Sequence, residues 1–186
     1  DGHWPIEEGF NDRARHPALQ KSVRAAIEAA ARQSARAVAV SVGDRIGVDD
    51  DAALTICAEG LAPLTGLAEA EGIDLLVEPL NTAIDHPEHQ CGSLGWARAL
   101  LDAVGSPRLR LLFDCYHVQI IQGDLTRALR EHAPLIGHVH TAGVPGRQDL
   151  GPDQEINWPW IARTLDDLGY DGVVSHEFFP RTSTAG

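Results

Sequence analysis

Cysteine is scarce in this chain of 186 residues, and methionine is absent. The three cysteines, Cys57, Cys91 and Cys115, form no Cys-x-x-Cys pair. This count and spacing argue against a disulfide framework and against a structural zinc site built from paired cysteines. Sparse, unpaired cysteines are typical of proteins in a reducing compartment, so we predict a cytoplasmic protein.

The chain also lacks long hydrophobic runs, a recognisable leader and an excess of basic residues. No apolar run approaches the roughly 20 residues of a membrane span. The first residues carry no basic, apolar and small-residue leader, and the chain begins with Asp1 rather than Met. Its formal net charge of −12 would repel a polyanion such as DNA on average. We therefore expect neither a membrane nor a nucleic-acid partner, while a homo-oligomer stays open.

Short apolar segments alternate with helix-forming segments along the chain. Near-continuous runs of Val, Leu and Ile suit strands that are buried on both faces of a parallel sheet. The predicted strands are 37–43, 73–80, 109–115, 135–141 and 170–178. The predicted helices are 18–35, 51–72, 94–105, 124–134 and 157–169. This alternation predicts an α/β fold with right-handed crossovers.

The spacing of the strands favours a barrel. A (β/α)8 barrel of about 250 residues needs roughly 31 residues per unit, and the five strands found here repeat at a similar interval. We expect residues 1–186 to form one partial TIM-barrel domain that lacks about the first three βα units. A complete five-stranded doubly wound sheet is the competing interpretation. The acidic stretch VGDRIGVDDD after the first strand carries no glycine-rich phosphate fingerprint, which gives a nucleotide-binding fold little support.

Residues able to ligate a metal stand at the ends of four successive predicted strands. They are Glu78, Asp114, His140 and Glu177, which lie 36, 26 and 37 residues apart in sequence order. Sites in parallel α/β folds form at the carboxyl ends of the strands. A single carboxylate at a strand end is more often a cap or a solvated charge, so the recurrence across four strands is the informative feature.

The chemistry of these four residues points to a divalent cation. Burying unpaired carboxylates at the mouth of an apolar barrel is costly, and a shared cation removes that cost. Three carboxylates and one imidazole suit Mn²⁺ or Mg²⁺ best, with Co²⁺ or Zn²⁺ as alternatives.

Several motifs together resemble a known family. The run from 137 to 180, GHVHTAGVPGRQDLGPDQEINWPWIARTLDDLGYDGVVSHEFFP, is accompanied in the same order by VEPLN, VGSPRL and FDCYHVQIIQGDL. This combination resembles hydroxypyruvate isomerase-like proteins of the xylose isomerase-like TIM-barrel superfamily. The resemblance implies a metal-dependent isomerase that acts on an α-hydroxy carbonyl substrate through an enediolate. It also implies four metal ligands, namely Glu78, Asp114, His140 and Glu177.

The resemblance implies further roles for individual residues. In the related ketose 3-epimerases two glutamates ligate the metal and exchange the proton, and we carry these roles to Glu78 and Glu177. His117 matches the histidine of the family's Asp-x-x-His motif, which contacts substrate. The position of His140 is glutamine in hydroxypyruvate isomerases and histidine in the epimerases, which keeps ketose 3-epimerase as an alternative function.

Other polar residues near the strand ends are expected to support the site. Arg147, in the loop after His140, is placed to hold a substrate carboxylate or hydroxyls. His138 points to the same face of its strand as His140 and is assigned to the layer beneath it. Asn81, just past Glu78, is expected either to hold a site residue from behind or to form a turn, and Glu155 either orders its loop or fixes Arg147. The histidines of the DHPEH segment, 85–89, are assigned to a long polar loop.

Two further functions are compatible with the same barrel. An endonuclease IV-like DNA-repair enzyme needs a richer, multi-zinc cluster and a basic DNA-binding face, which the net charge of −12 disfavours. A non-catalytic barrel would be expected to carry a broken ligand set, and the set found here is complete.

Overall fold

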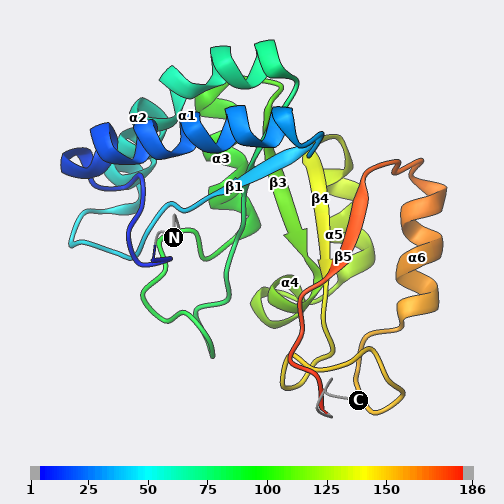
Figure 1. The fold of residues 1–186 in the computed structure, drawn as a ribbon. Helices are drawn as coiled ribbons and strands as arrows, with labels where there is room; N and C mark the ends of the chain where they lie inside the picture. Colours follow the sequence, from blue (N-terminus) through cyan, green and yellow to red (C-terminus); the bar gives the residue numbers. More distant parts are fainter. Residues whose placement is uncertain (1–4, 182–186) are drawn as a thin grey trace.

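The computed structural model describes residues 5–181, which contain a five-stranded, all-parallel sheet (Figure 1). Each strand lies inside one of the five predicted segments. The strands are β1 (Ala37–Val40), β2 (Asp74–Val77), β3 (Leu109–Asp114), β4 (Ile136–Thr141) and β5 (Val173–His176).

The order of the strands in the sheet distinguishes the two predicted architectures. The sheet order is β1-β2-β3-β4-β5, so each strand pairs with the next one in the chain. A doubly wound sheet reverses its strand order at a switch point, whereas a barrel adds every strand on the same side. The observed order therefore confirms a barrel-type sheet and excludes the doubly wound alternative. Figure 1 shows the helices bordering this sheet, from α1, α2 and α3 to α6.

The helices occupy the intervals between the strands. They are α1 (His16–Arg32), α2 (Asp50–Glu71), α3 (Leu94–Val104), α4 (Cys115–Ile121), α5 (Leu125–His132) and α6 (Trp158–Asp167), with 3₁₀ turns η1 (Arg13–Arg15) and η2 (Ala133–Leu135). Sequence-encoded caps define several of their ends. Asp49 accepts a hydrogen bond from the Ala52 amide, and α2 stops at Gly72, whose φ of 70° suits glycine. Within residues 5–181, every helix is too short or too polar to cross a membrane.

The core lies between the sheet and the helices. Leu75 and Val77 of β2, Phe113 of β3 and Val139 of β4 are essentially unexposed, and they pack with residues such as Leu64 of α2. The three cysteines are buried and free, in agreement with the absence of a disulfide framework. This core fixes the strands rigidly beneath the side chains that project from their carboxyl ends.

A β-bulge in β4 sets which face the two histidines occupy. Leu111 pairs with Ile136, but Leu112 pairs with His138, so Gly137 is an extra residue. Without this bulge, alternation would place His138 on the face of the sheet that carries the core. A Cβ on Gly137 would come within 2.8 Å of Leu76 Cδ2, which explains the glycine.

Candidate metal and substrate site

The four predicted ligands converge at the carboxyl ends of the strands. Glu78 follows β2, Asp114 ends β3, and His140 lies near the end of β4 opposite Asp114. Glu177 follows β5, and its amide donates to the Thr141 carbonyl oxygen. One potential ligand atom from each of the four side chains lies within 4.8 Å of the others. The regular spacing in sequence thus corresponds to one compact cluster in space.

Two cationic side chains contact the carboxylates of this cluster. His140 Nδ1 lies 3.1 Å from Glu177 Oε2 and 3.7 Å from Glu78 Oε1. Arg147 Nη2 lies 2.6 Å from Glu177 Oε2 and 3.6 Å from Asp114 Oδ2. Hydrogen bonding to His140 and the nearby Arg147 charge outweigh burial and lower the pKa of Glu177 to about 2.

The charge of the deepest carboxylate, Asp114, is only partly compensated by Arg147. Asp114 is unexposed, and burial together with the Glu78 charge raises its pKa to about 7. Its Oδ1 accepts from the Tyr116 amide, but within residues 5–181 Oδ2 is buried without a hydrogen-bond partner, and so is Glu78 Oε1. Buried polar atoms normally have partners, and hard divalent cations prefer oxygen ligands. These two oxygens therefore fit a divalent ion, and Glu177 and His140 lie where they complete its coordination.

The protonation of His140 bears on metal binding. Burial disfavours a charged imidazole, but the hydrogen bond to Glu177 and the nearby negative charges of Glu78 and Glu177 outweigh it and raise the pKa of His140 to about 10. A histidine ligates metal in its neutral form, so an ion bound here would displace a proton from His140.

Arg147 reaches the cluster because the chain turns sharply after β4. The amide of Gly143 donates to the Gln148 carbonyl oxygen over 2.7 Å, which closes the turn between them. Arg147 adopts a positive φ of 53° in this turn, and its guanidinium carbon lies 5.3 Å from the Tyr116 ring centroid. The predicted placement of Arg147 over the site is therefore observed. Tyr116 is a neighbour that the sequence interpretation did not single out.

His117 and Asn81 lie together at the same end of the sheet. His117 is unexposed in the first turn of α4. Its Nδ1 lies 3.1 Å from the Asn81 backbone nitrogen, and its Nε2 is buried without a partner. Burial and the positive charge of Arg147 lower the pKa of His117 to about 3, so its ring is neutral.

Of two residues expected to support the site, His138 lies where it was predicted, whereas Glu155 does not contact Arg147. His138 faces the same side as His140, with ring centroids 4.9 Å apart, and its Nε2 lies 2.7 Å from Ser175 Oγ. This matches the predicted layer beneath the ligand. The prediction that Glu155 fixes Arg147 is wrong, because the exposed Glu155 carboxylate accepts from Gln119 instead. The Glu155 amide donates to the Val144 carbonyl oxygen, so the residue does order its loop.

The segment 85–89 is only partly the polar loop that we predicted, because His89 is 2% exposed. Its Nδ1 has no hydrogen-bond partner and lies 3.6 Å from Asp44 Oδ1. Burial, with the neighbouring His86 and Arg45, lowers the pKa of His89 to about 4. Little in the sequence indicated that His89 is buried, because a histidine among charged residues is usually exposed to solvent.

His89 is expected to make the protein less stable in mild acid. The pKa of histidine in an unfolded chain is about 6.5. Between about pH 6.5 and 4, His89 therefore binds a proton in the unfolded chain but not in the native protein. Stability therefore falls as the pH falls through this window, by about 3 kcal/mol at pH 4 for this residue alone. Urea unfolding at pH 7 and pH 4 should show a smaller acid loss for His89→Gln than for wild type. Equal losses in the two proteins would contradict this role.

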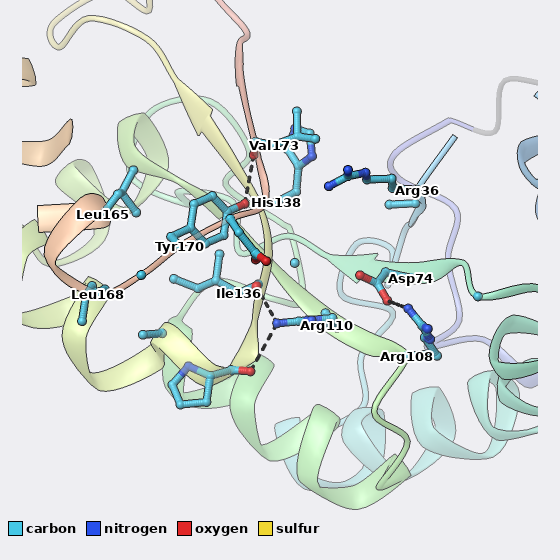
Figure 2. A pocket seen from close by; sticks show the side chains of 18 residues that line it. Arg36, Asp74, Arg108, Arg110, Ile136, His138, Leu165, Leu168, Tyr170 and Val173 are labelled. Atoms are coloured by element: carbon cyan, nitrogen blue, oxygen red, sulfur yellow. Dashed lines mark hydrogen bonds and ion pairs between the residues drawn. The ribbon is translucent and has the colours of Figure 1, made fainter. Parts of the chain in front are cut away.

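A cavity of about 570 Å³ lies at the other end of the strands (Figure 2). Asp74 and Arg108 form an ion pair at 2.9 Å in its wall, and Arg110 donates to the Ile136 carbonyl oxygen. None of the four clustered ligands lines this cavity. Its position at the amino ends of the strands is where barrel residues usually serve stability rather than chemistry.

The fold and the cluster together define a class of protein. Parallel strands in sequential order, with ligand-type residues at four successive carboxyl ends, are characteristic of a TIM-barrel metal site. The chain belongs to the xylose isomerase-like TIM barrel family, whose model matches residues 3–186. The resemblance noted from the motifs is thereby confirmed.

Named relatives fall in the same family. The chain is 38% identical over 141 residues to the putative hydroxypyruvate isomerase of Homo sapiens, covering 76% of this chain and 50% of that protein. It is 39% identical over 128 residues to the 2-oxo-tetronate isomerase of Cupriavidus necator, covering 68% and 48%. The chain thus spans about half the length of the curated relatives it matches.

Solved structures share the fold. A protein from Brucella melitensis described as an AP endonuclease of family 2 is 31% identical, with a TM-score of 0.85 over 91% of this chain and 65% of that one. A D-psicose 3-epimerase superposes with a TM-score of 0.80 at 21% identity, over 97% of this chain and 64% of that one. The second likeness, at this identity, supports the architecture alone.

Proposed function

We propose that the complete protein is a metal-dependent isomerase of an α-hydroxy carbonyl acid such as hydroxypyruvate or a 2-oxo-tetronate. The observation that carries the proposal is the four-residue cluster with its two unpartnered buried oxygens, on Glu78 and Asp114. Relatives at 38–39% identity are named for these two isomerisations, which supports the substrate class.

The metal would be held by Glu78, Asp114, His140 and Glu177, and Mn²⁺ or Mg²⁺ suits this oxygen-rich set best. Such an ion supplies Lewis acidity, which stabilises the negative charge that develops on the substrate oxygens. The burial of Asp114 keeps this end of the site dry, where electrostatic stabilisation is strongest.

Glu78 and Glu177 would carry out the proton transfer. Isomerising hydroxypyruvate removes a proton from C3, forms an enediolate, transfers the proton of the C3 hydroxyl to the C2 oxygen, and returns a proton to C2, which leaves an aldehyde at C3 and a hydroxyl at C2. Glu78 and Glu177 come from β2 and β5, with β3 and β4 between them, so they approach a bound substrate from different sides. One carboxylate takes the proton and the other returns one.

Arg147 would bind the substrate carboxylate through its guanidinium. In the free protein this group lies 2.6 Å from Glu177 Oε2 and helps to hold the pKa of Glu177 low. A substrate carboxylate that draws Arg147 away would therefore remove one of the causes that lower the pKa of Glu177, while the larger one, the hydrogen bond to His140, would remain. His117, whose ring is neutral and whose Nε2 has no partner, would donate a hydrogen bond to a substrate oxygen.

The assay that tests this function uses the complete natural chain, stripped with a chelator and then given Mn²⁺, Mg²⁺, Co²⁺ or Zn²⁺. We expect chelation to abolish the isomerisation of hydroxypyruvate or a 2-oxo-tetronate, and one of these ions to restore it. Activity that survives chelation would contradict the metal-dependent mechanism. Turnover of free ketoses alone, or cleavage of abasic DNA alone, would replace the proposal by the epimerase or the DNA-repair alternative.

A further inference from the structure

Asp85 joins the two residues proposed to bind substrate, although it contacts none of the four clustered ligands. Its Oδ2 accepts hydrogen bonds from Asn81 Nδ2 at 2.7 Å and from the Tyr116 hydroxyl at 2.8 Å. Burial acts to raise the pKa of Asp85, but these two hydrogen bonds outweigh it and lower the pKa. Asp85 is thus an ionised acceptor of two hydrogen bonds. One donor, Asn81, contacts His117, and the other, Tyr116, contacts Arg147.

The hydrogen bond to Asn81 connects Asp85 to His117. Asn81 Oδ1 accepts from the amides of Ile84 and Asp85, which identifies Nδ2 as the donor end of the side chain. Nδ2 lies 2.8 Å from His117 Nδ1, and the Asn81 backbone amide also donates to that nitrogen. A ring nitrogen that receives two donors carries no proton.

The neutral His117 ring therefore carries its hydrogen on Nε2. This nitrogen is buried without a partner among residues 5–181. The His117 ring centroid lies 5.2 Å from that of Tyr116, and the Tyr116 ring also contacts the Arg147 guanidinium, so the His117 ring lies beside the cluster. An unpaired, buried N–H in this place is free to donate to a bound oxygen.

The hydrogen bond to Tyr116 connects Asp85 to Arg147. The Tyr116 hydroxyl is tied to Asp85, and the ring of the same residue lies 5.3 Å from the Arg147 guanidinium carbon. Tyr116 is 2% exposed, so its ring has little freedom once the hydroxyl is held. A cation over an aromatic face is attracted to it, which keeps the guanidinium above the site.

We infer that Asp85 is a positioning residue that holds His117, through Asn81, and Arg147, through Tyr116, in the orientation that binds substrate. The inference rests on the proposed function for the roles of His117 and Arg147. Asp85 itself touches neither the substrate nor the metal. Because Asp85 is an exposed residue, replacing it removes the two hydrogen bonds without opening the core.

Kinetics of the complete protein test this role first. We expect Asp85→Ala to lower kcat/KM by about 10–100-fold, as is typical when a supporting hydrogen bond behind a site is lost. Divalent-ion affinity should stay unchanged. Asp85→Asn, which keeps an acceptor oxygen, should restore most of the activity. Tyr116→Phe, which cuts only the Arg147 branch, should fall between wild type and Asp85→Ala.

A double-mutant comparison separates positioning from a general structural effect. In a His117→Ala/Arg147→Ala background, adding Asp85→Ala should cause no further loss. Asp50→Ala is the matched control, because Asp50 Oδ1 also accepts two hydrogen bonds, from Arg45 and from Gln90. Gln90 lies in the same loop as Asp85, between β2 and α3. The control should keep wild-type kcat/KM. An equal loss in the control, or a full additional loss in the double background, would overturn the inference.

Nitrogen-15 NMR of the imidazoles gives a readout that needs no turnover. At pH 7 we expect His117 to be neutral with its proton on Nε2, and the resonance to shift or broaden in Asp85→Ala but not in Asp85→Asn. A proton on Nδ1, or no response to Asp85→Ala, would overturn the inference. Because this readout is independent of activity, it stands even if the isomerase assay fails, and so the two failures are distinguishable.

Discussion

Replacing Glu177 by glutamine is expected to abolish turnover of the complete protein while leaving its fold intact. The amide cannot accept a proton, and it also removes a negative charge from the ligand set. Loss of a general base alone costs about 10²–10⁴-fold in rate, and the lost ligand adds to this. The Glu177 side chain is 49% exposed and packs into no core, so unfolding curves should change little.

The measurement is kcat with hydroxypyruvate and saturating Mn²⁺, together with deuterium exchange of the substrate C3 proton. Glu131→Gln is a matched control, because Glu131 is 48% exposed and pairs with Arg127 over 3.0 Å, as Glu177 pairs with Arg147. The control should retain full activity. A Glu177→Gln protein that still forms product at the wild-type rate would remove Glu177 from the proton-transfer step, whereas exchange of the C3 proton without product would assign the removal of the C3 proton to Glu78 and its return at C2 to Glu177.

Replacing Asp114 by asparagine is expected to have effects of opposite sign with and without metal. Asparagine keeps the oxygen that accepts from the Tyr116 amide, but it replaces the buried, unpartnered Oδ2 by a neutral amide nitrogen. Because ionised Asp114 is costly in the metal-free protein, where its pKa is raised to about 7, the variant should be as stable as wild type or more stable.

With metal, the same variant should lose affinity by about 100-fold or more, since a charged ligand is gone. That loss corresponds to about 2.7 kcal/mol of metal-dependent stabilisation. Calorimetric titration with Mn²⁺ and thermal unfolding with and without the ion measure both effects. If Asp114→Asn were strongly destabilised without metal and bound Mn²⁺ normally, Asp114 would be a structural residue rather than a ligand.

Much of the site follows from the sequence because the information is local. A residue at the end of a buried parallel strand lies at the same edge as its counterparts on neighbouring strands. The spacing of Glu78, Asp114, His140 and Glu177 was therefore enough to predict one cluster, and the observed ligand atoms lie within 4.8 Å of one another. The turn that brings Arg147 back over this edge was also readable from its glycine and proline residues.

Features that depend on register or on distant partners were not predictable in this way. The bulge at Gly137 decides the face on which His138 and His140 lie, and only the pairing of β3 with β4 reveals it. A glycine inside a strand was the available signal for this bulge. Asp85 and Tyr116 come from segments 31 residues apart, and no sequence pattern indicated their hydrogen bond. Glu155 was expected either to order its loop or to fix Arg147, and the sequence did not indicate that its carboxylate accepts from Gln119 of α4.

An anomalous-scattering map of the complete protein crystallised with Mn²⁺ would locate the metal directly. We expect one strong peak at the carboxyl ends of β2 to β5, bonded to Glu78, Asp114, His140 and Glu177 at coordination distances of about 2.0–2.6 Å. Arg147 should be displaced from Asp114 in that map. A crystal that contains Mn²⁺ but shows no peak at this cluster, or shows its only peak elsewhere, would contradict the account.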